Sequence, residues 1–294
     1  MAGGVIRVLD LFSGIGGFSL GLERAGQFET VAFCEIEPYC RAVLAKHWPG
    51  VPCFEDVRSL TKDVLAAAGI HDIDCITGGF PCQDISVAGK QAGLGAGTRS
   101  GLWSEIIRLA GELRPRYIIV ENVAALLAGP TEKRGGWFGR ILGDLAECGY
   151  DAEWENIPAA AMGAPHLRER VWIVAYPSQE RQSEAGQLRP GQFAQWLPGG
   201  GEAFVSAYAG QVGTEGHKPQ EVSGFSGFSW CKDVRRAEDL RKRSDIPEPL
   251  FRGSRDGVPD WVDRVAACGN AVIPQIPEMI GRAILRYEAN AAAT

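Results

Sequence analysis

Short apolar runs alternate with amphipathic stretches along the first 176 residues of the chain. The apolar runs are of strand length and predict buried strands at Val5–Asp10, Thr30–Cys34, Asp74–Thr77, Arg116–Val120 and Val171–Tyr176, with an irregular strand at Val51–Val57 and a strand-like stretch at Tyr150–Ile157. The 3.6-residue period between them predicts helices at Phe18–Ala25, Pro38–His47, Thr61–Ala68, Leu102–Leu113 and Trp137–Cys148. This alternation indicates an α/β fold built on a doubly wound, mostly parallel, Rossmann-like sheet.

The alternating pattern stops after Tyr176. Residues 177–259 are rich in Gly, Gln, Ser, Pro and Trp, and their only helix-like piece lies near residues 232–243. The pattern returns with Asp260–Val265 and a helix over Gln275–Tyr287. We therefore expect one catalytic, cofactor-binding domain over 1–176, completed by 260–294, with a smaller, irregular domain over 177–259 inserted into it.

Composition restricts the class of protein. The 294 residues carry a formal net charge of −6, and they contain no apolar run of 18 residues and no signal-peptide pattern at the start. The eight cysteines are unevenly spaced without a C-x-x-C pair, and only four histidines are present, which gives no support to a metal site. We therefore expect a cytoplasmic protein with reduced thiols, no metal and no contact with membranes.

A glycine-rich loop, Leu11–Leu20, follows the first predicted strand and leads into a helix. Its glycines allow a tight turn and leave room for a nucleotide-like ligand, although helix–strand packing also selects glycine. Glu35 ends the second strand, where a carboxylate can accept hydrogen bonds from both hydroxyls of a ribose. Asp56 follows the irregular strand and could accept a hydrogen bond from an adenine amino group. Together these residues indicate an adenosine-containing ligand.

The sequence TGGFPCQDIS at 77–86 presents a thiol, Cys82, where a predicted strand ends. Ligands bind at this edge of open α/β sheets, and Pro81 stiffens the loop. Free cysteines are more often packed in cores, but the flanking Gly-Gly and Gln-Asp pairs argue against a core position. The strand that ends at Val120 delivers Glu121 and Asn122 to the same edge, and the long loop Val87–Ser100 is typical of a lid or binding loop.

These pieces, taken in order, resemble the DNA (cytosine-5-)-methyltransferases. The resemblance covers about 1–176 and 260–290 and rests on the glycine-rich loop, Glu35, Pro81-Cys82-Gln83, Glu121-Asn122-Val123, Arg168-x-Arg170 and the segment GNAVIP at 269–274. The arginine motif departs from the family, which commonly has Gln-Arg-Arg before the second arginine, whereas this chain has His166-Leu167-Arg168-Glu169-Arg170. Both spaced arginines are nevertheless present.

The resemblance implies S-adenosylmethionine as cofactor and a covalent mechanism. The implied catalytic residues are Cys82, Glu121, Arg168 and Arg170. The implied cofactor-binding residues are Phe12, Ser13, Gly14, Ile15, Gly16, Gly17, Glu35, Ile36, Asp56, Val57, Pro81, Leu102, Asn270 and Val272. By this resemblance the thiolate of Cys82 adds to C6 of a cytosine, Glu121 neutralises charge at N3, and Arg170 binds O2.

The same resemblance makes duplex DNA the substrate and 177–259 the target-recognition domain. Because C5 and C6 are buried in the base stack, the target cytosine has to flip out. The basic cluster Lys232–Arg243, which could also be a solvated helix face, would then contact phosphates. We expect a monomer; the recognition sequence and the existence of a partner restriction endonuclease stay open.

Three other interpretations remain. A transfer-RNA cytosine methyltransferase would share the motifs, but the insert of about 80 residues favours DNA. A nicotinamide-dependent dehydrogenase would also use a glycine-rich turn and Glu35, yet it leaves the 81–83, 121–123 and 269–274 motifs unexplained. An inactive DNA-binding relative is the third, although Cys82, Glu121 and Arg170 are all present.

Overall fold

The computed structural model of the chain describes residues 4–80, 99–128, 136–162, 168–178 and 267–291. The predictions for Pro81, Cys82, most of the 87–100 loop, the 177–259 insert beyond Ser178 and its basic cluster lie outside the described residues.

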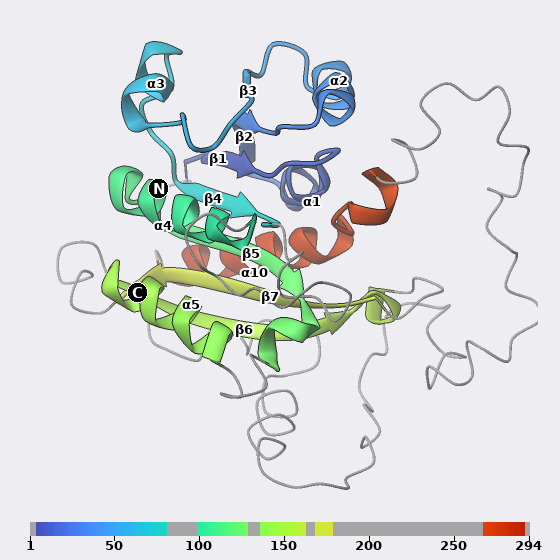
Figure 1. The fold of residues 1–294 in the computed structure, drawn as a ribbon, viewed down its shortest axis with the longest axis vertical. Helices are drawn as coiled ribbons and strands as arrows, with labels where there is room; N and C mark the ends of the chain where they lie inside the picture. Colours follow the sequence, from blue (N-terminus) through green and yellow to red (C-terminus); the bar gives the residue numbers. More distant parts are fainter. Residues whose placement is uncertain (1–3, 81–98, 129–135, 163–167, 179–266, 292–294) are drawn as a thin grey trace, which may run out of the picture.

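The core of the fold is a seven-stranded sheet with the order β3-β2-β1-β4-β5-β7-β6 (Figure 1). The strands are β1 (Ile6–Leu11), β2 (Phe28–Cys34), β3 (Cys53–Phe54), β4 (Cys75–Gly78), β5 (Tyr117–Val123), β6 (Tyr150–Pro158) and β7 (Glu169–Pro177). The pairs from β3 through β5 are parallel, whereas β7 is antiparallel to both β5 and β6. The predicted mostly parallel sheet is confirmed.

Helices pack on both faces of this sheet. They are α1 (Gly17–Ala25), α2 (Pro38–His47), α3 (Lys62–Ala67), α4 (Trp103–Leu113), α5 (Gly136–Glu147) and α10 (Gln275–Ala291), with short 3₁₀ turns at Arg99–Leu102, Ala124–Leu127 and Ala159–Met162. One apolar core joins α3, α4 and α5 to one face of the sheet, and a second joins α1 and α10 to the other. Figure 1 shows α4 and α5 on one side of the sheet and α10 behind it.

The alternation of side chains along each strand decides which core a residue joins. In β1, Ile6 and Val8 face α1 and α10, while Leu9 and Leu11 face the opposite core. In β5, Tyr117 and Ile119 belong to the α1–α10 face and Ile118 and Val120 to the other. By the same period Glu121 continues the α1–α10 face. The strand pattern therefore directs Glu121 toward the side of the sheet where the C-terminal segment returns.

Two details differ from the sequence prediction. The irregular strand predicted over Val51–Val57 contains only the two residues of β3. Strand β5 continues through Val123, so Glu121 and Asn122 lie within the strand and not beyond its end. The reversal of β7 follows from its short connection to β6, because parallel neighbours need a crossover of a dozen or more residues.

Within the described ranges, no helix is long and apolar enough to cross a membrane.

Candidate active site

The carboxylate of Glu35 holds the glycine-rich loop against the end of β2. Its Oε2 accepts a hydrogen bond from the backbone N–H of Gly14 at 2.6 Å, and its Oε1 accepts one from the N–H of Glu37 at 2.9 Å. Phe12, the first residue after β1, takes a left-handed backbone conformation with φ 53°, which an L residue rarely adopts. Ser13, which is buried, donates from its N–H to the carbonyl of Cys34. The loop is thereby fixed on the second strand.

The glycines of this loop have different functions. A Cβ at Gly14 would have nothing within 4 Å, which leaves open space beside Glu35. A Cβ at Gly16 would lie 2.6 Å from the ring of Trp48, and one at Gly17 would lie 2.5 Å from the carbonyl oxygen of Val272. Room for a ligand is therefore available at Gly14, whereas Gly16 and Gly17 are required by close packing within the protein.

The remaining predicted cofactor residues lie at several places around this loop. The side chain of Ile36 is 60% exposed next to the buried Glu35. Asp56 follows β3, and its Oδ1 accepts the N–H of Arg58 at 2.9 Å. Val57 is buried, Leu102 and Ile15 are partly buried, and Asn270 is exposed. An apolar side chain and two carboxylates thus lie at the ends of neighbouring strands.

On the opposite half of the sheet, Glu121 of β5 pairs with Arg170 of β7. The Nε of Arg170 lies 2.8 Å from Oε1 of Glu121, and the carboxylate is mostly buried. Trp172, also buried, is the residue directly opposite Glu121 in the β5–β7 register. Burial raises the pKa of Glu121, while the positive charges of Arg170 and Arg168 act against that rise. A carboxyl in this environment can hold a proton more readily than an exposed one.

Arg168 joins the C-terminal segment to the same edge. Its Nη1 donates to the carbonyl of Gly269, and its Nη2 donates to that of Ala271 at 2.9 Å. Its backbone is left-handed, with φ 34°. Burial lowers the pKa of Arg168, and the charge of Arg170 adds to this effect. Two of the donors of Arg168 are therefore engaged within the protein, whereas Arg170 is directed to Glu121.

The chain that leads to Cys82 is positioned by β5. Asn122, which is buried, donates from Nδ2 to the carbonyl of Phe80 at 3.1 Å. A Cβ at Gly79 would lie 3.3 Å from Oε2 of Glu121, so a side chain there would press on the carboxylate. The backbone two residues before Cys82 is thus fixed beside Glu121. Cys82 and Pro81 themselves lie outside the described residues.

Sequence reasoning missed Asp10, which is fully buried at the centre of this region. Its Oδ1 accepts a hydrogen bond from Thr77 Oγ1 at 2.7 Å, and its Oδ2 accepts one from Ser19 Oγ at 2.8 Å. Burial raises the pKa of Asp10 to about 7. Asp10 therefore connects β4, the strand that precedes Cys82 in the chain, to α1, the helix that follows the glycine-rich loop. The available signal was a carboxylate in the apolar second half of a strand, between Leu9 and Leu11.

Comparisons with known proteins agree with this geometry. The family model "C-5 cytosine-specific DNA methylase" matches residues 6–197. The Type II methyltransferase M.NgoMIV of Neisseria gonorrhoeae is 39% identical over 319 aligned residues, which cover 95% of this chain and 96% of the relative. M2.BsuMI of Bacillus subtilis is 36% identical over 58% of this chain, and that match spans only 42% of the relative's length.

A solved structure adds a match at the level of the fold. A crystal structure assigned as a DNA modification methyltransferase encoded within a prophage of E. coli has a TM-score of 0.50 and 29% identity, covering 64% of this chain and 50% of that one. The family model extends over more than half of the chain, and one relative matches along nearly its whole length. The chain therefore belongs to the C-5 cytosine-specific DNA methylase family.

Proposed function

We propose that the protein transfers a methyl group to C5 of a cytosine in a specific sequence of duplex DNA. The observation that carries this proposal is the partly buried Glu121–Arg170 pair at 2.8 Å, beside the Gly79–Phe80 backbone that leads to Cys82. An acid that can hold a proton, a cation and a nearby thiol are the groups that activation of a pyrimidine ring requires. Family membership supports the assignment of C5 as the methylated position.

The residues at the β1–β3 end suit S-adenosylmethionine. The exposed apolar side chain of Ile36 provides a surface for a flat base, and Glu35 retains lone pairs for ribose hydroxyls after accepting two N–H bonds. The open space at Gly14 would accommodate the methionine part, and Asp56 would accept from the adenine amino group. When bound, this cofactor supplies an electrophilic methyl group.

The chain's own residues would carry the remaining chemistry. The Cys82 thiolate adds to C6, and the electron pair moved to C5 makes that carbon nucleophilic. Glu121, protonated or sharing its proton with N3, neutralises the charge that develops on the ring, and Arg170 binds O2. After C5 is methylated, water takes the C5 proton as a base, the C–H electron pair re-forms the C5–C6 double bond, and the C6–S bond breaks to release the thiolate. Each group acts on charge that is absent from the ground state.

We assign Arg168 a positioning task in this scheme. Its bonds to the carbonyls of Gly269 and Ala271 hold the segment in which the carbonyl of Val272 lies against Gly17. Gly17 begins α1, directly after the cofactor loop. Arg168 thus connects the base-facing edge to the cofactor side, and it supports the pocket without touching the base.

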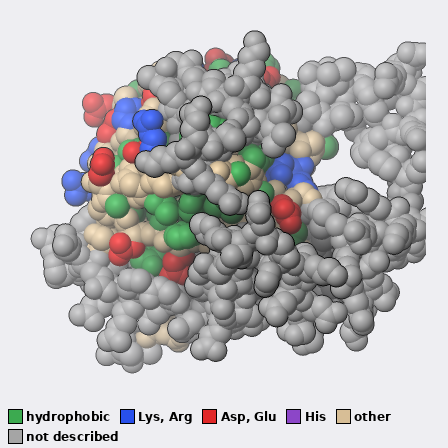
Figure 2. Space-filling view, turned by 60° about the horizontal axis from the view of Figure 1, so that its bottom comes forward, with side chains coloured by type: hydrophobic (Ala, Val, Ile, Leu, Met, Phe, Trp, Pro, Cys, Tyr) green, Lys and Arg blue, Asp and Glu red, His purple; other side chains and the backbone are tan. Residues whose placement is uncertain are grey.

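Recognition of DNA is assigned to residues 177–259, and phosphate contacts to Lys232–Arg243. Figure 2 shows described Lys and Arg side chains near Asp and Glu side chains on one face, with hydrophobic side chains between them. Such mixed charge attracts phosphates weakly, and we therefore assign the phosphate contacts to the basic cluster of the sequence and not to this face. The target cytosine would flip out of the duplex, since its reacting atoms lie inside the stack. Relatives named Type II methyltransferases support a restriction–modification context with a partner endonuclease.

One assay tests the proposal. The protein is incubated with S-adenosylmethionine labelled in its methyl group and with either duplex DNA or transfer RNA. We expect label in DNA alone, at C5 of cytosine, and no transfer by Cys82→Ala, which should still bind the cofactor. Cys148→Ala, which removes a partly buried thiol near α4, is the matched control and should retain activity.

A second substrate tests the covalent step. DNA with 5-fluorocytosine at the target should trap the wild-type protein in a denaturant-resistant adduct, because fluorine at C5 cannot leave as a proton does. Labelled transfer RNA would refute the DNA assignment, and turnover by Cys82→Ala would refute the nucleophile.

A further inference from the structure

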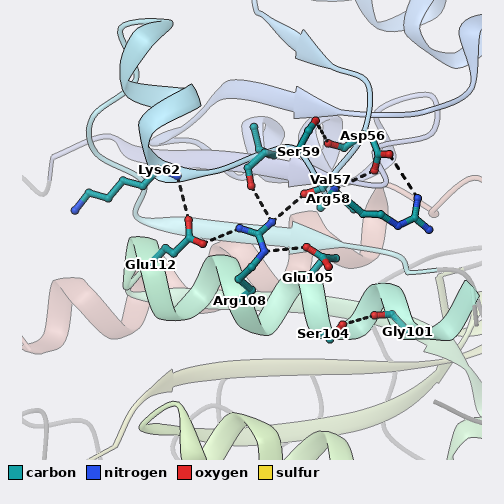
Figure 3. A network of polar contacts seen from close by, with 11 residues as sticks. Asp56, Val57, Arg58, Ser59, Lys62, Gly101, Ser104, Glu105, Arg108 and Glu112 are labelled. Carbon is teal, nitrogen blue, oxygen red and sulfur yellow. Dashed lines mark hydrogen bonds and ion pairs between the residues drawn. The ribbon is translucent and has the colours of Figure 1, made fainter. Parts of the chain in front are cut away.

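Helix α4 lies beside the segment that connects β3 to α3, residues 55–61, here called the β3–α3 segment. Arg108 of α4 reaches this segment with one terminal nitrogen (Figure 3). Its Nη2 donates to the carbonyl of Val57 at 3.0 Å and to the carbonyl of Leu60 at 2.8 Å. Both residues are buried, at 4% and 1% exposure, so water is a poor substitute for the guanidinium at these carbonyls.

Two carboxylates of the same helix orient the guanidinium of Arg108 toward the β3–α3 segment. Nε of Arg108 lies 2.9 Å from Glu105 Oε2, and Nη1 lies 2.7 Å from Glu112 Oε1. All three nitrogens of Arg108 are therefore engaged, and its planar fork has a defined direction toward the β3–α3 segment. A lysine could hold the charge between the two glutamates, but it lacks this fixed geometry.

The far end of the segment is tied to α4 as well. Glu112 Oε2 accepts the backbone N–H of Lys62 at 3.1 Å, where α3 begins. At the near end, the carbonyl of Asp56 accepts hydrogen bonds from the N–H of Ser59 at 3.1 Å and from its hydroxyl at 2.8 Å. Asp56 thus starts a compact turn whose later carbonyls are held by Arg108 (Figure 3).

We infer that Arg108 is a positioning residue that fixes the carboxylate of Asp56 for recognition of the adenine amino group. This inference rests on the proposed function, in which Asp56 contacts the adenine of the cofactor. Arg108 would act through the turn, because its contacts are with the carbonyls of Val57 and Leu60 and with the two glutamates. It therefore contributes to selectivity for adenine and takes no part in the methyl-transfer step.

The test compares two ligands in the full-length protein by calorimetry: S-adenosylhomocysteine and its analogue that lacks the amino group on the purine. Wild type should bind the amino-bearing ligand about tenfold or more tightly, the scale of a hydrogen bond to a charged group. In Arg108→Gln this preference should fall to about twofold or less, and KM for the cofactor should rise more than kcat falls. Arg140→Gln, which removes an exposed arginine paired with Asp144 on α5, should match wild type in all three measurements.

The outcomes separate the two proposals. If wild type does not distinguish the ligands, the assignment of Asp56 to adenine is wrong. If wild type distinguishes them and a folded Arg108→Gln does so equally, the role of Arg108 is overturned. Should Arg108→Gln lose its cooperative melting transition, Arg108→Lys keeps the charge and is measured in its place. A preference that falls to about twofold or less supports the inference, and a larger remaining preference contradicts it.

Discussion

The two halves of the proposed site are built differently: the cofactor side at Gly14 and Glu35, and the base-facing edge at Glu121, Arg168 and Arg170. At the cofactor side, Glu35 holds Gly14 and Glu37, which are 21 and 2 residues away along the chain. At the base-facing edge, Arg168 holds carbonyls 101 and 103 residues away, across the whole insert. Local contacts can form before the rest of the chain folds, whereas the base-facing edge needs β5, β7 and the C-terminal segment together. The proposed chemistry thus depends on contacts between segments that are far apart in the sequence.

The largest expected effect comes from breaking the base-facing edge. Glu121→Gln should lower kcat by at least about a hundredfold, the scale of a lost general acid, with little change in cofactor binding. The reason is that, in the proposed mechanism, an amide cannot supply the proton that the carboxyl of Glu121 gives to the ring. Single-turnover methyl transfer and calorimetry with S-adenosylhomocysteine measure the two quantities.

Glu155→Gln is the matched control for that experiment. Burial raises the pKa of Glu155 to about 7, but this residue lies on β6 and not at the site. It should retain nearly full activity. Normal transfer by Glu121→Gln would contradict the protonation role.

Asp10, which contacts both regions through Ser19 and Thr77, gives a pH-dependent effect. Its pKa rises on folding from 3.8 to about 7, so the folded state binds more protons than the unfolded state between these values. The resulting contribution to stability is present at low pH and is lost as pH rises to about 7. The free energy of unfolding should therefore fall by about 3 kcal/mol between pH 5 and pH 8, because each pH unit between the two pKa values costs about 1.4 kcal/mol.

Asp10→Asn should remove this contribution, and urea unfolding at several pH values measures it. Asp72→Asn, a change at an exposed carboxylate that pairs with Arg7, serves as control. Parallel stability curves for wild type and Asp10→Asn would show that the carboxyl does not change protonation over this range.

The junction between the two regions is tested by Gly17→Ala. The added methyl would meet the carbonyl oxygen of Val272 at 2.5 Å, and this backbone cannot move freely because Arg168 holds its neighbours. We expect a loss of about 1–3 kcal/mol of stability, typical of overpacking, together with weaker cofactor binding. Denaturant unfolding and calorimetry measure both.

Gly139→Ala provides the comparison for Gly17→Ala. Gly139 lies in α5, and a Cβ there meets nothing within 4 Å. Alanine should therefore stabilise the protein by about 0.5–1 kcal/mol through its better helix propensity. Equal behaviour of the two variants would show that the contact with Val272 is not tight.

The smallest effect is expected in the basic cluster, which lies outside the described residues. Neutralising Arg235 and Arg236 should weaken binding to all duplexes alike and reduce the log–log salt slope by about one unit per lost phosphate contact. Binding titrations on specific and unrelated duplexes at several salt concentrations measure this. An unchanged affinity and slope would identify the cluster as a solvated helix face.

Much of the fold could be read from the sequence because its signals are local. The alternation of apolar runs with amphipathic stretches predicted the strands and helices of residues 5–176, including α2 with its bounds unchanged. Where local pattern was weak, the prediction was wrong in detail: β3 is only Cys53–Phe54, and β5 runs on through Glu121 because β7 pairs with it. Pairing with a distant strand is invisible to a pattern of neighbouring residues.

The sequence by itself determined the family, the order of the motifs and the residue types available for chemistry. Only the tertiary structure decided which contacts these residues make. Arg170 pairs with Glu121, whereas Arg168 holds the C-terminal segment. Gly17 is needed for close packing and not for ligand space. These distinctions depend on which groups fill the space around a side chain. That space is formed by segments as far apart along the chain as Gly17 and Val272, and it exists only once the sheet has assembled.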